Sequence, residues 1–87
     1  MTLSGELTFA NATRVLAGAR SEVASGSGPV ELDLSAVTRV DSAGLALLLE
    51  LAREAREGKR ELRCTRAPEQ LRKLAEFFGL TSLLSLS

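Results

Sequence analysis

The side chains best placed to do chemistry lie together in segment 40–44, Val-Asp-Ser-Ala-Gly, where a β-branched run gives way to a long apolar helical pattern. This spacing predicts a serine hydroxyl at a helix N-terminus, where unpaired backbone N–H groups and the helix dipole favour an acceptor or an anion. Ser42 can therefore act as an N-cap, or as a hydroxyl that carries a phosphoryl group. The residues alone favour the N-cap.

Two carboxylates, Asp33 and Asp41, could form a metal site, but two acids without a third ligand are a weak signal. We interpret Asp41 as shaping the loop and contacting a partner, with Asp33 as a secondary candidate. The chain has no His and a single cysteine, Cys64, which is expected to be a buried strand residue. Imidazole-assisted catalysis and a zinc site are therefore not expected. We predict no catalytic residue, metal or cofactor, and no enzyme.

Composition points to one globular domain, residues 1–87, with 45% hydrophobic residues. Eleven basic and eleven acidic residues cancel, so the chain has no global field to hold nucleic acid or an anionic membrane. Basic residues between positions 53 and 66 alternate with glutamates, which is typical of a solvated face. The apolar block 45–49 is far shorter than a membrane span, no secretion leader is visible, and a lone cysteine fits a reducing cytoplasm.

The pattern of elements alternates strands with helices. Strands are predicted at 3–7, 30–34 and 61–65, and helices after a cap at Asn11, over 42–57 with Gly58 as C-cap, and from Pro68 to Gly79. In the last helix the residues predicted to face inward are Leu71, Leu74, Ala75 and Phe78. The tail 80–86 predicts either a terminal strand or a docked turn. This order favours an α/β domain with helices on one face of a sheet.

The central helix is expected to have two apolar faces. The core stripe is predicted to hold Leu45, Leu48, Leu49, Ala52 and Ala55. The far side is predicted to hold Ala43, Leu47, Glu50, Leu51 and Glu54. A wide core stripe would bury Leu51, but Leu47 is expected to be exposed. An exposed leucine beside the Asp-Ser motif indicates a docking patch.

Three segments together resemble the STAS domain family over almost the whole chain: 3–8, Leu-Ser-Gly-Glu-Leu-Thr; 30–35, Val-Glu-Leu-Asp-Leu-Ser; and 40–45, Val-Asp-Ser-Ala-Gly-Leu. The resemblance implies a mixed sheet of about four strands. It also implies a further strand before segment 3–8, yet Met1 lies only a few residues ahead, so we expect that first strand to be missing. An uncovered sheet edge invites other chains, and a homodimer could form there.

Two branches of the family compete. In anti-sigma factor antagonists, the serine matching Ser42 is phosphorylated by a partner kinase. Segment 39–51 is more similar to the MlaB-type branch, the small STAS subunits of the bacterial ABC transporter that maintains outer-membrane lipid asymmetry. That resemblance implies a cytoplasmic subunit that binds and supports the transporter's ATPase around Ser42, and reaches the inner membrane only through that partner.

The expected function is therefore protein binding. Partner contact is predicted for Ser42, Ala43 and Leu47 at the centre and for Asp41, Glu50 and Glu54 at the rim. The alternative is an anti-sigma factor antagonist in which phosphorylation of Ser42 expels the kinase. A lipid- or nucleotide-binding module is ranked last, because the chain has no phosphate-cradling glycine loop and no aromatic pocket.

Overall fold

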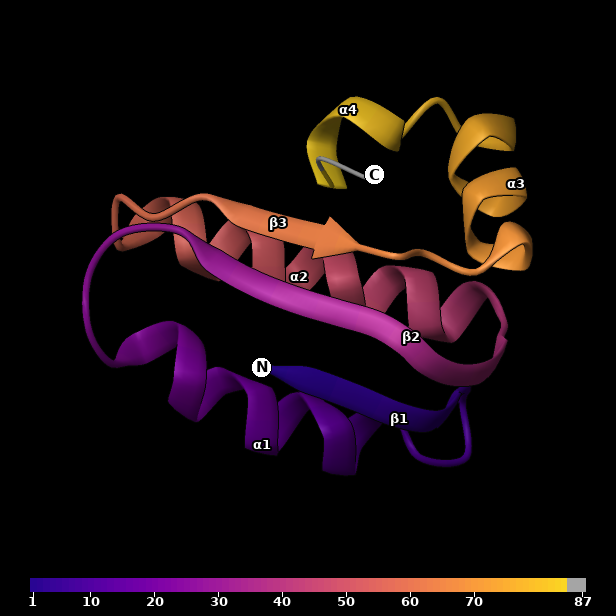
Figure 1. Ribbon diagram of the computed structural model, residues 1–87, viewed down its shortest axis with the longest axis horizontal. Helices are drawn as coiled ribbons and strands as arrows, with labels where there is room; N and C mark the ends of the chain where they lie inside the picture. Colours follow the sequence, from indigo (N-terminus) through magenta and orange to yellow (C-terminus); the bar gives the residue numbers. More distant parts are fainter. Residues whose placement is uncertain (85–87) are drawn as a thin grey trace.

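A computed structural model, which describes residues 1–84, has three parallel strands alternating with helices (Figure 1). The elements are β1 (Thr2–Leu7), α1 (Ala12–Ala24), β2 (Val30–Val40), α2 (Ser42–Glu57), β3 (Leu62–Thr65), α3 (Glu69–Phe77) and α4 (Thr81–Leu84). The strands are ordered β1-β2-β3. The predicted α/β class is confirmed, although the described sheet has three parallel strands rather than about four in a mixed arrangement.

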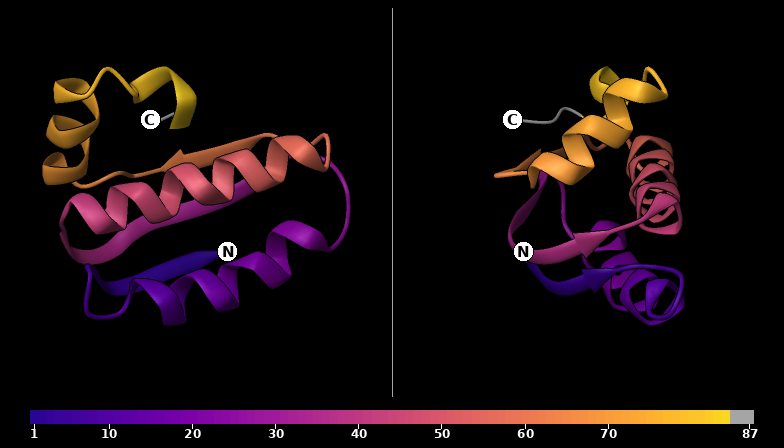
Figure 2. Two further views of the ribbon diagram at one scale, coloured as in Figure 1. Left: turned by 180° about the vertical axis from the view of Figure 1, so that it is seen from behind. Right: turned by 90° about the vertical axis from the view of Figure 1, so that its right-hand side faces the viewer.

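The helices lie on one face and beyond one edge of the sheet. Helices α1 and α2 cover one face, while α3 and α4 lie beyond β3 (Figure 2). The predicted one-sided packing therefore holds for α1 and α2. Because the strands are parallel, their carboxyl ends meet at one edge, to the right of Figure 1, where α2 and α3 begin. This edge positions the Asp-Ser motif.

The central strand β2 is longer than the predicted 30–34. Its first half alternates buried apolar residues with outward-facing Glu31 and Asp33, as a half-buried strand should. Its second half pairs with β1 up to the pair Leu7 and Val40, and Val37 and Val40 are buried. Pairing with β1 therefore extends the strand to the residue before Asp41.

Gly44 determines which face of α2 turns inward. A Cβ atom at this position would lie 2.0 Å from the backbone carbonyl oxygen of Leu7, so only glycine lets the first turn of α2 rest on β1. The buried residues of α2 as a whole are Gly44, Leu45, Leu47, Leu48, Leu51 and Ala55.

The prediction of an exposed Leu47 is wrong, because its side chain is only 4% exposed. The buried arc of α2 is centred nearer Leu48 and Leu51 than the predicted stripe, and Leu49 and Ala52 lie at its half-buried margin. Relative to the predicted orientation, α2 is rotated about its own axis by less than ~100°, the angle between successive residues. This rotation is enough to bring Leu47 into the core.

The remaining helix ends differ in detail from the predictions. Asn11 occupies the predicted N-cap position of α1, but its side-chain oxygen accepts from the Thr8 N–H at 3.0 Å and makes no capping bond to the helix. Pro68 is the N-cap of α3 rather than its first residue. Segment 80–86 was predicted as a strand or a docked turn, but its described part forms the short helix α4, whose Leu84 is buried. Residues 85–87 lie outside the described part.

The β1 edge and the surface charges bear on partners. Within residues 1–84 no strand pairs with the outer edge of β1. The pairing of β1 with β2 is irregular on both sides of the consecutive residues Ser4 and Gly5.

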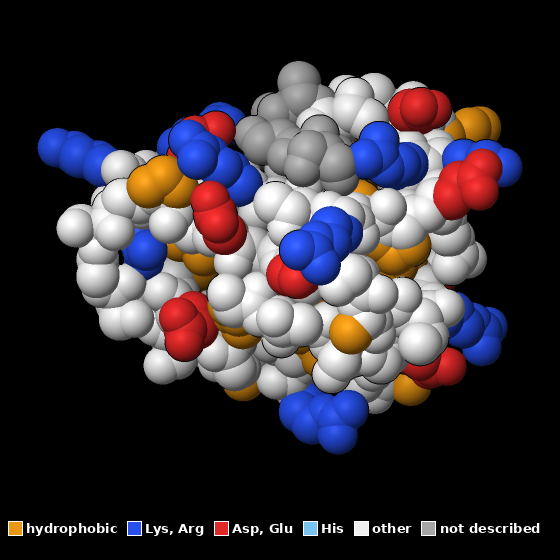
Figure 3. Space-filling model, in the orientation of Figure 1, with side chains coloured by type: hydrophobic (Ala, Val, Ile, Leu, Met, Phe, Trp, Pro, Cys, Tyr) orange, Lys and Arg blue, Asp and Glu red, His pale blue; other side chains and the backbone are white. Residues whose placement is uncertain are grey.

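Acidic and basic side chains are interspersed on the face seen in Figure 3. Arg53 pairs with Glu50 and Glu57, as expected for a solvated face of compensating charges. Over residues 1–84, no helix is long and apolar enough to cross a bilayer.

Candidate functional site: the start of α2 and the adjoining groove

Asp41, not Ser42, caps α2. The Oδ1 atom of Asp41 accepts from the Gly44 N–H at 3.0 Å, and its Oδ2 atom accepts from the Phe9 N–H at 3.1 Å. The bonds from Phe9 and Gly44 hold the pKa of the Asp41 carboxyl below its ordinary value. The prediction of Ser42 as N-cap is wrong, because Ser42 is the first residue of the helix. The loop-shaping role predicted for Asp41 agrees with these bonds, which join the β1–α1 loop to α2.

Ser42 faces solvent beside a surface depression. Its side chain is exposed, and the Ser42 hydroxyl makes no hydrogen bond within residues 1–84. The depression, of about 550 Å³, is here named the Ser42 groove. The residues that line it are Arg39, Val40, Asp41, Ser42, Gln70, Lys73, Leu74 and Phe77.

One wall of the Ser42 groove is a face of α3. The lining residues of α3 recur at helical spacing from Gln70 to Phe77, and the Gln70 side-chain oxygen accepts from the Val40 N–H at 3.0 Å. Phe77 is 83% exposed, and Phe78, predicted to face inward, is 53% exposed. The sequence prediction did not single out Phe77, which lines the groove. The sequence signal that could have identified it was the adjacent pair of phenylalanines ahead of Gly79. Because consecutive residues of a helix point to different faces, the two rings could not both face the core.

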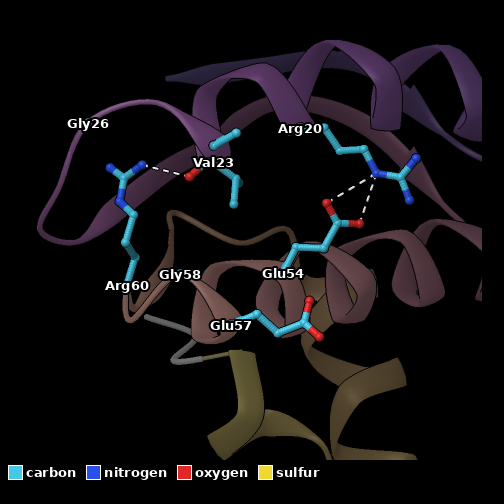
Figure 4. Close-up of a pocket in the computed structure, with 8 residues that line it drawn as sticks. Arg20, Val23, Gly26, Glu54, Glu57, Gly58 and Arg60 are labelled. Carbon is cyan, nitrogen blue, oxygen red and sulfur yellow. Dashed lines mark hydrogen bonds and ion pairs between the residues drawn. The ribbon is translucent and has the colours of Figure 1, made fainter.

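The predicted rim residues Glu50 and Glu54 lie away from Ser42, on the side of α2 that α1 covers. Glu54 accepts from Arg20 Nε at 2.8 and 3.1 Å, as Figure 4 shows. Glu50 pairs with Arg53 and lies 3.8 Å from Arg20, and the hydrogen bond from Arg53 lowers the pKa of Glu50. The backbone positions of Glu50 and Glu54 lie about 12 and 18 Å from that of Ser42 along the helix axis. Of the other predicted contact residues, Asp41 and the half-buried Ala43 adjoin Ser42.

The two aspartates do not form a metal site. Asp33 and Asp41 are eight positions apart on an extended segment, a separation of about 26 Å. Asp33 accepts from the Ser35 N–H at 2.9 Å, which lowers its pKa, and it lies 3.8 Å from Arg66. Within the described residues no three metal-ligating side chains converge. Cys64 is buried, and burial raises its thiol pKa to about 12.

Comparison with known proteins identifies the family of this chain. The family model described as "Mlab, STAS domain" matches residues 1–85. This chain belongs to the MlaB-type STAS domain family. A similar protein is the "Intermembrane phospholipid transport system binding protein MlaB" of Haemophilus influenzae, which is 38% identical over 56 residues. The match covers 64% of this chain and 53% of that protein, so the chain spans about half the length of this curated relative. The resemblance drawn from the sequence is confirmed.

A second depression of this STAS domain, of about 260 Å³, lies at the other end of α2 (Figure 4). Arg60 donates from Nε to the Gly28 carbonyl oxygen at 2.8 Å and from Nη1 to that of Val23 at 2.8 Å. The same Nη1 also reaches the carbonyl oxygens of Glu22 and Ser25. These contacts give donors to carbonyls that the end of α1 leaves unpaired, so this depression has a structural role.

Proposed function

We propose that this STAS domain is a protein-binding subunit of a phospholipid-transport ABC complex that maintains outer-membrane lipid asymmetry, and that it acts by contact rather than by catalysis. It docks on the ATPase subunit at the cytoplasmic face of the inner membrane and reaches the membrane only through that partner. The family assignment and the name of the Haemophilus influenzae relative support this role.

The observation that carries the proposal is the exposed Ser42 hydroxyl without an internal partner. The nearby Asp41 and Gly44 already have partners inside the domain, because Asp41 caps α2 and Gly44 packs against the backbone of Leu7. Ser42 and the adjoining Ala43 are therefore free to contact another protein. The centre of the docking surface is the start of α2, and Leu47 has no part in it because its side chain is buried.

Docking affects the ATPase by favouring one of its arrangements. A bound subunit shifts an equilibrium only as far as its affinity for the two states differs. We propose that the STAS domain binds the assembly-competent arrangement of the ATPase more tightly. Its removal then lowers both the yield of assembled complex and the rate of ATP hydrolysis.

Replacement of Ser42 by arginine tests this proposal. Ser42→Arg fills the docking surface, and Ser21→Arg places the same side chain on exposed α1 as a matched control. Each variant is coexpressed with the ATPase subunit of the phospholipid transporter encoded in the same genome. We expect Ser42→Arg to lose copurification and to lower ATP hydrolysis, with an unchanged thermal melt, and Ser21→Arg to behave as wild type. Normal copurification of Ser42→Arg would refute the contact.

The exposure of Ser42 also favours a second function, that of an anti-sigma factor antagonist. A phosphate on the Ser42 hydroxyl would gain from the helix N-terminus and from the cations Arg39 and Lys73 of the same groove, and would be opposed by Asp41. Incubation with serine kinases from the same genome, followed by intact-mass measurement, separates the two functions. One added phosphoryl group, lost in Ser42→Ala, supports the second function over the first.

Self-association through β1 is a further proposal, because the outer edge of that strand is unpaired within the described residues. The irregular pairing around Gly5 bends an edge strand and opposes regular addition of another strand. Light scattering of the purified domain between micromolar and millimolar concentration measures whether a dimer forms.

A further inference from the structure

Helices α3 and α4 form an arm, residues 67–84, that lies beyond β3 and apart from the layer of α1 and α2 (Figure 2). The free energy that holds an element in place rises with the apolar area that the element buries. The arm has a small set of described buried side chains, namely Leu71, Ala75 and Leu84. Helix α2 alone buries Leu45, Leu47, Leu48, Leu51 and Ala55. The arm is therefore held more weakly than α2.

Gln70 carries the polar link between the arm and the sheet. In the described part of the chain, its side-chain oxygen accepts from the Val40 N–H at 3.0 Å. The ion pair between Lys73 and Glu69 lies within α3 and does not reach the sheet. By contrast, Arg60 donates to several carbonyl oxygens at the end of α1. The side of the domain that contains α1 thus has stronger polar ties than the arm has.

The segment that joins β3 to α3 is strained and weakly fixed. Arg66 has a φ of 54°, in the left-handed region that residues other than glycine seldom adopt. Its ion pair with Asp33, at 3.8 Å, is exposed and contributes little. Pro68 occupies the N-cap position of α3 and makes no side-chain capping bond. Because an isolated helix of nine residues is marginal in water, α3 unfolds once it leaves the sheet.

We propose that the arm opens and unfolds as one unit about residues 66–68, while the sheet, α1 and α2 stay folded. Opening removes one side of the Ser42 groove, because Gln70, Lys73, Leu74 and Phe77 all belong to the arm. It also uncovers the outer edge of β3, the last strand of the described sheet. The arm is therefore a conformational device, and the groove exists only while the arm is closed. The device works in the same way whichever molecule binds at Ser42.

Native-state hydrogen exchange of the purified domain measures this opening. We expect the amides of residues 71–77 in α3 to exchange at least about tenfold faster than those of residues 48–55 in α2. The α3 exchange should depend only weakly on added denaturant, because opening of the arm exposes less surface than global unfolding does. Equal rates and equal denaturant dependence in the two helices would overturn the proposal.

A matched pair of variants at Gln70 tests the link between the arm and the sheet. Gln70→Ala removes the acceptor of the Val40 N–H, whereas Gln70→Glu keeps an oxygen at the same place on the side chain. We expect α3 exchange to rise about tenfold in Gln70→Ala and to change less than about twofold in Gln70→Glu, with α2 exchange unchanged in both. Equal acceleration of α2 and α3 in Gln70→Ala would mean that the two helices open together, which contradicts the proposal.

Trypsin gives a second measurement on the unsubstituted chain, because both helices carry exposed cleavage sites. These are Arg53 and Arg56 in α2 and Arg72 and Lys73 in α3. Cleavage of a transiently opened segment tracks the population of its open form. We expect cleavage within α3 to be at least about tenfold faster than cleavage within α2, as read from fragment masses at early times. Cleavage at equal rates in the two helices would refute opening of the arm alone.

Discussion

The two ends of α2 both adjoin a surface depression, but only one of them is satisfied from within the chain. At the C-terminal end, Arg20 is bonded to Glu54, and Arg60 donates to carbonyl oxygens at and beyond the end of α1. At the N-terminal end, the Ser42 hydroxyl has no bond within residues 1–84, and the exposed ring of Phe77 lines the groove. The first end holds the fold together, whereas the second presents groups that another molecule can use.

The difference gives a criterion for proposing a docking surface in a small domain. Charged side chains and a surface depression are present at both ends and do not separate them. What separates them is whether each polar group and each large apolar group already has a partner. The sequence pattern places Leu47, Glu50 and Glu54 on the same helix face as Ala43. In the structure they already have partners inside the domain, since the core covers Leu47 and α1 covers the two glutamates.

The largest effect is expected from Gly44, which belongs to the N-terminal end but is buried. Gly44→Ala places a methyl group 2.0 Å from the Leu7 carbonyl oxygen, so α2 must move off β1. We expect a loss of about 3 kcal/mol in the free energy of unfolding, or failure to fold. Chemical denaturation measures it. Gly18→Ala is the control, since open space surrounds that position in α1, and it should gain about 0.5–1 kcal/mol.

The next effect is expected from Arg60 at the C-terminal end of α2. Arg60→Met keeps an apolar stem but removes the donors to the carbonyl oxygens of α1 and its following loop. The expected loss of stability is about 2 kcal/mol, because carbonyls lose charge-assisted bonds. Arg56→Met, at an exposed basic position, should change stability by no more than about 0.5 kcal/mol. Unchanged ATPase binding in both variants would sharpen the comparison between the ends.

A smaller, pH-dependent effect is expected from Asp41. Its folded-state pKa is lowered by the Phe9 and Gly44 bonds, so its ionised form stabilises the fold above the ordinary carboxyl pKa. That stabilisation disappears as the pH falls through the lowered pKa. Asp41→Asn should therefore lower Tm by roughly 5 °C at neutral pH, with the difference from wild type narrowing below about pH 4. Thermal melts from pH 7 to pH 2 measure this, and a constant difference would contradict it.

The smallest effect is expected from the exposed Arg20–Glu54 pair. Arg20→Leu removes the ion pair in which Arg20 Nε donates to both carboxylate oxygens of Glu54, but exposed pairs of this kind contribute little. We expect Tm to change by less than about 4 °C and the change to shrink at 1 M salt, where screening is strong. A large loss of ATPase affinity in this variant would break the comparison, because it would place partner contact at the C-terminal end.

The sequence predicted the length of α2 better than its orientation. Its start follows a β-branched run and its end precedes Gly58, so local signals mark both limits. Nearly every residue from 43 to 49 is apolar, so periodicity alone allows several buried arcs. The arc is chosen by contact between Gly44 and Leu7, a strand residue far away in the chain. Local pattern cannot contain that information, which is why Leu47 was misplaced.

The start of α2 was predicted in position, but the roles of Asp41 and Ser42 at that start were not. Asp41 and Ser42 are adjacent and both are good N-cap residues, so the sequence allows either to cap α2. The choice agrees with the position of the Phe9 N–H, which supplies a second donor to Asp41. The groove forms because α3 packs against the end of β2, where the Gln70 side chain accepts from the Val40 N–H. No local sequence motif predicts this contact. Phe77 was missed for the same reason.

The bonding of Asp41 to both the β1–α1 loop and α2 has an evolutionary consequence. Because the neighbouring hydroxyl makes no bond within residues 1–84, natural selection can alter position 42 at little cost to folding. Under the docking proposed above, descendants of one ancestral domain can thus acquire different binding preferences by changing a single side chain. Their architecture is preserved meanwhile by the aspartate and the glycine on either side.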